Sequence, residues 1–206
     1  YYNNTIKYEG DFVKDKHEGY GKYVYENGNY YIGHYLNGLR HGKGTVYYKD
    51  HTIMYKGDFV KDKYEGQGEY VYENGNYYIG HTLNGLSHGK GTIYYKNNTI
   101  KYEGDFIKDK PEGYGKYFWE DGTYYIGHYW NGLKHGKGTI YYKNDKIKYE
   151  GDFVKDKPKG LGKYYFEDGN YYIGQYLNGL KHGKGIEFYK NNTIKYEGDF
   201  VKDKYE

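Results

Sequence analysis

Histidine, lysine and glycine recur together in this 206-residue sequence as Gly-x-x-His-Gly-Lys-Gly. Histidine is a common metal ligand, so the first chemistry to consider is metal binding. The motif returns every 47 residues, which corresponds to four strands of an antiparallel sheet, or about 19 Å at about 4.8 Å per strand. Equivalent histidines are therefore too far apart to share a metal. Within one repeat only His34 and His41 pair, without a carboxylate or thiol in register, and we expect no metal site.

The Gly-Lys-Gly segment of the same motif could bind phosphate. A phosphate-binding loop needs a glycine-rich turn that opens a helix, with Ser or Thr after the Lys, and here a strand is expected instead. We therefore expect no nucleotide binding. The lysines could instead contact anionic lipid headgroups, each contributing about 1 kcal/mol near an acidic membrane, although an aspartate recurs just as regularly from Asp11 on. The candidate lipid-binding residues are Lys43, Lys90, Lys137 and Lys184.

Catalysis has little support in the remaining polar residues. The chain has no cysteine, its only serine is Ser87, and its acidic, basic and histidine side chains follow the repeat period as on a solvated repeat surface. No unique constellation interrupts that period. We expect a protein that is not an enzyme and that needs no cofactor.

These residues belong to a regular internal repeat. The segment that starts at Tyr8 returns at Tyr55, Tyr102, Tyr149 and Tyr196, and a second segment that starts at Tyr31 returns at Tyr78, Tyr125 and Tyr172. The spacing predicts a single array over residues 1–206, with partial repeats at both ends. The eight complete repeats are 8–30, 31–54, 55–77, 78–101, 102–124, 125–148, 149–171 and 172–195.

Each repeat reads as a β-hairpin. Tyr31–Leu36 and Gly44–Lys49 alternate in character and predict two strands joined by a loop over Asn37–Gly42. Asn-Gly or Asp-Gly, as in Glu26–Asn29, predicts a tight turn to the next repeat. In the other repeat type we expect a looser turn, as at Lys96–Thr99, to contain the extra residue. No helical period occurs, so the fold class is all-β, a single-layer antiparallel sheet of stacked hairpins.

Tyrosine and glycine share one face of this sheet. Only 36% of residues are hydrophobic, yet the chain has 36 Tyr and 33 Gly. Alternation along a strand places Tyr31, Gly33 and Tyr35 on the same side. A ring from a neighbouring strand can cover the gap that a strand glycine leaves, and we expect this pairing to replace an aliphatic core.

The segment Tyr31-Ile-Gly-His-Tyr-Leu-Asn-Gly-Leu-Arg-His-Gly-Lys-Gly resembles the MORN (membrane occupation and recognition nexus) repeat, and the resemblance covers nearly all of the chain. It implies an elongated, twisted sheet and functions as varied as membrane tethers, cytoskeletal scaffolds and accessory regions of enzymes. Asp15 stands where the other repeat type has Gly38, so we expect its hairpin turn to differ in shape.

The first functional hypothesis is a scaffold that binds a protein partner or a second copy of itself, since exposed aromatic surface marks interaction sites and both sheet edges are open. Phe118, Trp119 and Trp130 make the third 47-residue unit the best candidate for tuning to one partner. The candidate partner-binding residues are Tyr23, Tyr25, Tyr31, Tyr35, Tyr70, Tyr72, Tyr78, Tyr117, Trp119, Tyr125, Tyr129, Trp130, Tyr172 and Tyr176.

Two alternatives remain: a module that binds membrane phospholipid, and the regulatory arm of a larger enzyme. Nucleic acid is not expected as a partner, because the net charge of +3 is spread over interleaved acidic and basic residues. The lack of cysteine fits a cytoplasmic location, with association to the cytoskeleton or a membrane, and leaves an extracellular one open.

Overall fold

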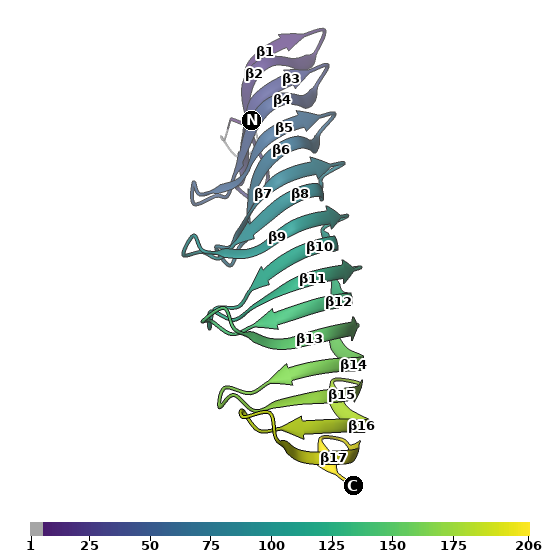
Figure 1. The fold of residues 1–206 in the computed structure, drawn as a ribbon. Helices are drawn as coiled ribbons and strands as arrows, with labels where there is room; N and C mark the ends of the chain where they lie inside the picture. Colours follow the sequence, from purple (N-terminus) through teal and green to yellow (C-terminus); the bar gives the residue numbers. More distant parts are fainter. Residues whose placement is uncertain (1–5) are drawn as a thin grey trace. The chain divides into compact units, whose positions relative to one another are not determined.

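The structure, a computed structural model, describes residues 6–206 and contains 18 strands and no helix in this range (Figure 1). It divides into two compact units. The first comprises the described residues up to Ile100 together with Phe106–Asp109, and the second comprises Lys101–Asp105 and Lys110–Glu206. None of the described residues belongs to a helix that could cross a membrane.

In each unit, strands that follow one another in sequence pair antiparallel, which confirms the all-β class and the stacking of hairpins. The first unit contains β1 (Tyr8–Val13), β2 (Lys16–Val24), β3 (Tyr30–Leu36), β4 (Leu39–Tyr47), β5 (Ile53–Val60), β6 (Lys63–Val71), β7 (Tyr77–Leu83) and β8 (Leu86–Tyr94). The residues of β9 (Ile100–Ile107) are divided between the units. The second unit continues with β10 (Lys110–Phe118), β11 (Tyr124–Trp130), β12 (Leu133–Tyr141), β13 (Ile147–Val154), β14 (Lys157–Tyr165), β15 (Tyr171–Leu177), β16 (Leu180–Phe188), β17 (Ile194–Val201) and β18 (Lys204–Tyr205).

A ladder of paired glycines runs across the strands of each unit. Gly21 pairs with Gly33, Gly33 with Gly44 and Gly44 with Gly57, and the series extends from Gly10 to Gly91 in the first unit. A matching series extends from Gly115 to Gly198 in the second unit. The ladder leaves a continuous strip of backbone without side chains.

A tyrosine two residues before every second ladder glycine, which we call the lead tyrosine, covers this strip. Tyr31 lies so close to Gly33 and Gly44 that a Cβ atom on either glycine would stand 2.3 Å from its hydroxyl oxygen. The hydroxyl donates a hydrogen bond of 3.0 Å to the carbonyl of His34, and the same bond recurs at Tyr55 and Tyr78. The lead tyrosines with at most 2% exposure are Tyr31, Tyr55, Tyr78, Tyr102, Tyr125, Tyr149 and Tyr172. The expected covering of glycine by tyrosine is therefore the core of the protein.

A second ring, four residues after the lead tyrosine, packs edge to face against it. The ring centroid of Tyr31 lies 5.3 Å from that of Tyr35 on the same strand and 5.0 Å from that of Phe59 on β5. Such pairs add about 0.5–1.5 kcal/mol beyond area burial. The position holds Phe or Tyr throughout the repeats with one exception, Thr82.

The hairpins close through two-residue turns, which corrects the loop expected over Asn37–Gly42. Only Asn37 and Gly38 form the turn, with φ values of 53° and 87°, and β4 begins at Leu39. Lys14 and Asp15 form an equally short turn with φ values of 47° and 61°. The expected difference in shape between the two turn types is therefore wrong, because both are two-residue turns with positive φ at each position.

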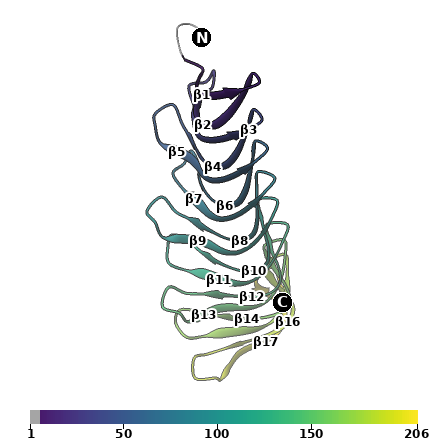
Figure 2. The same cartoon turned by 90° about the horizontal axis from the view of Figure 1, so that it is seen from above.

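The connections between hairpins also share one geometry, and these turns lie at the opposite ends of the strands from the hairpin turns (Figure 2). In both types the first residue donates to the carbonyl of the residue four positions later, as from Tyr25 to Asn29 and from Tyr48 to Thr52. His51 takes the left-handed conformation that Gly28 takes in the other type. The extra residue of the 24-residue repeat lies instead in a β-bulge next to Ile53, where the register with β4 shifts, so the expectation of a looser turn is wrong.

Carboxylates and backbone groups connect turns to earlier strands. Arg40 donates its N–H to Asp62 Oδ1 over 2.9 Å, and Asp62 returns its own N–H to the Arg40 carbonyl over 3.0 Å. This reciprocal clamp explains how Asp62, a non-glycine residue, is held at a φ of 69°. It recurs between Asp109 and Ser87 and between Asp156 and Lys134.

The glycine ladder yields a stability prediction. Gly33→Ala should destabilise the chain by about 2–3 kcal/mol, because the new Cβ meets both the Tyr31 ring and the Gly44 backbone. Gly38→Asn in the same hairpin is the matched control, since Asn tolerates a positive φ and the nearest side-chain atom is 3.6 Å from the new Cβ. Urea unfolding measures both. Equal losses in the two variants would contradict the covering role of Tyr31.

Candidate functional site

The structure separates the predicted partner-binding residues into three groups. The buried ones are Tyr31, Tyr35, Tyr78, Tyr125, Tyr129, Tyr172 and Tyr176, which form the core described above. The half-buried ones are Tyr23, Tyr25, Tyr70, Tyr72, Tyr117 and Trp119. Trp130 is 54% exposed and lies on the opposite face of β11 from Tyr125 and Tyr129, because side chains alternate along a strand. Only the half-buried group can present rings to a partner from the tyrosine side, which we call the aromatic face.

A cation lies among these rings in β4. The Arg40 guanidinium carbon is 5.6 Å from the Tyr31 ring centroid and 5.1 Å from that of Phe59. Its Nη1 donates to the Tyr25 hydroxyl over 3.2 Å, and its Nε is 3.1 Å from Asp62 Oδ1. Two rings, a hydroxyl and a carboxylate thus surround one internal cation, an arrangement that we call a cation cage.

The second unit has two further cages at equivalent positions. Lys134 Nζ lies 5.1 Å from the Trp119 ring centroid and 3.8 Å from Asp156 Oδ1. Lys181 Nζ lies 4.9 Å from the Phe166 centroid and 4.7 Å from the Tyr172 centroid, and it also pairs with Glu187. Each cage therefore holds a cation of its own chain.

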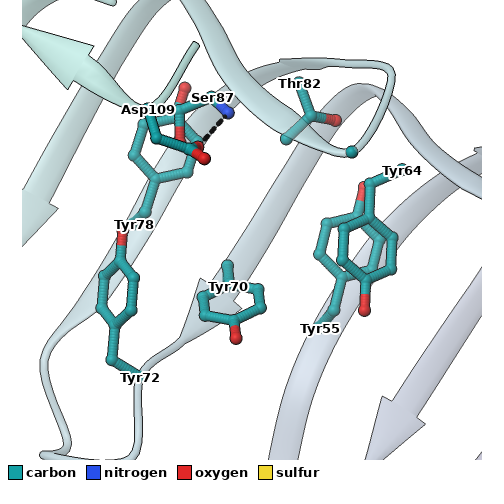
Figure 3. A pocket seen from close by; sticks show the side chains of 9 residues that line it. Tyr55, Tyr64, Tyr70, Tyr72, Tyr78, Thr82, Ser87 and Asp109 are labelled. Atoms are coloured by element: carbon teal, nitrogen blue, oxygen red, sulfur yellow. Dashed lines mark hydrogen bonds between the residues drawn. The ribbon is translucent and has the colours of Figure 1, made fainter.

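The equivalent place in β8 lacks a cation and contains a pocket. Ser87 replaces the basic residue of β4, β12 and β16, and Thr82, its cross-strand partner, replaces the second ring. Figure 3 shows the resulting pocket, about 470 Å³ in volume, with Thr82 between Tyr55 and Tyr64 on one side and Ser87, Tyr78 and Asp109 on the other. Tyr72 and Tyr70 complete the aromatic wall. The pocket lies entirely within the first unit.

Polar groups in this pocket are held in place by the surrounding backbone. Asp109 Oδ1 accepts the Ser87 N–H over 2.7 Å, and the Thr82 hydroxyl donates to the Gly66 carbonyl over 3.2 Å. The Tyr78 hydroxyl donates to the His81 carbonyl over 2.7 Å. The arrangement offers rings and one carboxylate for binding.

Three tyrosines of the pocket are harder to ionise than free tyrosine. Burial raises the pKa of Tyr64 to about 12, and burial together with the charge of Asp109 raises the pKa of Tyr72 to about 12. Burial also raises the pKa of Tyr78 to about 12, although a hydrogen bond with Ser87 opposes the shift. The aromatic wall is thus neutral at physiological pH.

The predicted lipid-binding lysines lie on the opposite face, and aspartates face them across the strands. Lys43 Nζ is 2.7 Å from Asp58 Oδ1, and Lys137 Nζ is 3.7 Å from Asp152 Oδ1. Lys184 is the cross-strand neighbour of Asp199. Lys90 occupies the corresponding position in β8. The row of cations is therefore partly neutralised.

The four motif histidines lie within strands rather than in loops. His41 and His135 are residues of β4 and β12, and the Nδ1 atom of His135 is buried without a hydrogen-bond partner in the described part of the chain. Among residues 6–206 no group of three or more His, Cys, Asp or Glu side chains is arranged to hold a metal.

Sequence reasoning missed the pocket because it is made by residues that are smaller than their counterparts. The signal is present as two departures from the period: Thr82 among Tyr35, Tyr129 and Tyr176, and Ser87 among Arg40, Lys134 and Lys181. The large departures Trp119 and Trp130 instead favoured the third 47-residue repeat as the binding region.

The raised tyrosine pKa values predict alkaline unfolding. Because the folded state holds Tyr64, Tyr72 and Tyr78 at about 12 against 10.0 for free tyrosine, their stabilising contribution is complete below pH 10 and is lost as pH rises from 10 to 12. Urea midpoints should fall as pH rises above 10, and tyrosinate absorbance should rise together with unfolding. Smooth ionisation of all tyrosines without loss of strand signal would contradict the burial of these rings.

The sequence model of the MORN repeat matches the chain over residues 8–30, 31–53, 55–77, 78–100, 102–124, 125–146, 149–171 and 172–194. No curated protein matches the sequence significantly. Among solved structures, the TCP10 domain of Danio rerio CPAP in complex with a STIL peptide is similar at 14% identity and a TM-score of 0.36, covering 94% of this chain and 99% of that one. A protein of unknown function from Bacteroides caccae is similar at 10% identity and a TM-score of 0.20, covering 94% and 75% of the two chains. Likeness at this level does not extend to a shared function. Since the repeat model accounts for most of the residues, the chain belongs to the MORN repeat family.

Proposed function

We propose that the chain is a non-enzymatic repeat scaffold that binds a protein partner through the aromatic face of its sheet. The observation that carries this proposal is a layer of half-buried rings that the glycine ladder does not require. The lead tyrosines already cover the glycines, whereas Tyr70 and Tyr72 lie beside them with solvent access.

This outer layer repeats in pairs along each unit. The ring centroids are 5.1 Å apart in Tyr23 and Tyr25 and 5.0 Å apart in Tyr70 and Tyr72. In the second unit those of Tyr117 and Trp119 are 5.2 Å apart. Tyr and Trp are enriched at binding hot spots because they bury a large area and have few rotatable bonds, so paired rings give a partner preformed contact points.

The alternative of binding anionic phospholipid through Lys43, Lys90, Lys137 and Lys184 has weaker support. Asp58 and Asp152 face Lys43 and Lys137, so a membrane would have to compete with a neighbouring carboxylate at both. Self-association, a regulatory role within a longer enzyme, and a location at the cytoskeleton or a membrane are further hypotheses.

Capture of a partner from extracts of the source organism tests the proposal. The double variant Tyr70→Ser/Tyr117→Ser removes one outer ring from each unit and should reduce partner retention at least about tenfold. The matched control, Tyr20→Ser/Tyr114→Ser, removes rings that are 61% and 58% exposed on the opposite face and should retain the partner.

Mass spectrometry of the retained proteins and circular dichroism of each variant give the readout. Loss of the partner from the control variant alone, or no retained protein at all, would contradict binding through the aromatic face. Sedimentation with acidic vesicles that Lys43→Glu and Lys137→Glu abolish would favour the lipid alternative.

A further inference from the structure

The four cation cages allow a comparison within one molecule. In three of them a cation from the chain lies over the rings: Arg40 near Tyr31, Lys134 near Trp119 and Lys181 near Tyr172. In each, the aspartate of the clamp also accepts the backbone N–H of the basic residue. The frame of a cage is therefore built by the backbone and is independent of the side chain at the basic position.

The fourth cage has this frame without its cation. Asp109 accepts the Ser87 N–H as in the other cages, and Tyr72 and Tyr78 occupy the positions of Tyr25 and Tyr31. Among the described residues Asp109 has no basic side chain as an ion-pair partner, and the Tyr72 hydroxyl has no hydrogen-bond partner. The corresponding hydroxyl of Tyr25 accepts a hydrogen bond from Arg40. A carboxylate, a hydroxyl and two rings thus line the place where the other three cages hold a basic side chain.

The missing ring makes this cage large enough for a ligand from outside. Elsewhere the second ring fills the space, as where the Tyr149 and Tyr176 centroids lie 5.3 Å apart, but Thr82 leaves it open. The pocket of about 470 Å³ is within the roughly 300–1,000 Å³ typical of ligand pockets. Asp109 is exposed and Tyr72 half-buried, so solvent reaches both.

We propose that this pocket receives the ammonium or guanidinium group of a Lys or Arg side chain supplied by a protein partner. The aliphatic stem would lie against Tyr64 and Tyr70, and the charged head would take the place of the absent Arg40 counterpart, between Tyr72, Tyr78 and Asp109. A Ca²⁺ or Mg²⁺ ion is a poor match because such ions need at least about six oxygen ligands, and one carboxylate lines the pocket.

The inference rests on the proposed function, because the source of the side chain is a protein partner, but its test does not need that partner. The probes are three capped tripeptides, acetyl-Gly-X-Gly-amide, with X as lysine, arginine or the uncharged norleucine. Titration is followed by NMR of the full chain. Lysine and arginine peptides should bind in the millimolar range and shift the resonances of Thr82 and Ser87, and the norleucine peptide should not.

Ser87→Arg and Ser87→Ala form the matched pair of variants. Ser87→Arg places a cation of the chain in the cage, as Arg40 does, and should abolish peptide binding while the thermal midpoint stays level or rises. Ser87→Ala leaves the cage without a cation and should bind as the original chain does. Asp109→Asn keeps the oxygen that accepts the Ser87 N–H and removes the charge, so affinity should fall about fivefold.

Equal binding of norleucine and lysine peptides, unchanged binding by Ser87→Arg, or no binding of either basic peptide to the folded chain would each overturn the inference. These results leave the proposed function intact if the outer rings still retain a partner. If Ser87→Arg loses the tripeptides but keeps that partner, the pocket binds basic side chains and the claim that the partner supplies one is wrong.

The second unit offers a converse experiment. Tyr129→Thr/Lys134→Ser reproduces both departures and should create a second site, seen as a peptide-dependent shift of the Trp119 indole resonance. Lys134→Ser alone keeps the Tyr129 ring that fills the space, so it is the matched control and should show no such shift. A double variant that is folded by circular dichroism but whose Trp119 resonance does not respond to lysine peptide would contradict the inference.

Discussion

The whole structure depends on a tyrosine ring lying directly on bare backbone. A single-layer sheet has no second layer to bury its face, and the chain has too few aliphatic residues to build one. Glycine at the cross-strand pair lets the ring of Tyr31 approach the main chain, and its hydroxyl then satisfies the His34 carbonyl. One residue type thus supplies apolar contact and a hydrogen bond in the same place, which explains why tyrosine rather than phenylalanine occupies this position in every repeat.

The rest of the aromatic face follows from this contact. Because each lead tyrosine covers its glycines with one side of its ring, its edges and its other side remain available. The edges take the second ring, as Phe59 does for Tyr31. The other side takes a cation in one repeat type, as Arg40 lies over Tyr31, and a stacked ring in the other, as Tyr64 lies on Tyr55. The aspartate clamp completes the set by fixing turns against earlier strands. The core, the cation cage and the turn are therefore all built around the lead tyrosine.

Sequence patterns predicted the features that are set by neighbouring residues, such as the face of a strand on which a side chain lies. They did not predict features that depend on residues far apart in the sequence. Alternation placed Tyr31, Gly33 and Tyr35 on one face, because a strand has a fixed period of two. The turn at Lys14 and Asp15 could not be recognised, because their positive φ values suit glycine better; in the equivalent turn Asp62 is held by the clamp to Arg40, 22 residues earlier. The bulge beside Ile53 escaped detection because an added residue can lie in a turn or a strand with the same sequence spacing. The pocket required comparison of equivalent positions, since Thr82 and Ser87 carry no signal by themselves.

The clamp between Asp109 and Ser87 has a consequence for how such arrays evolve. Its hydrogen bonds use the main-chain N–H and C=O of residue 87, so natural selection can change that side chain without removing the clamp. After duplication of a 47-residue unit, each copy inherits a self-neutralised cage, and two substitutions can open one copy while the others keep theirs. Copies can then come to bind different ligands when smaller side chains replace larger ones in one copy, while all copies keep the same backbone frame.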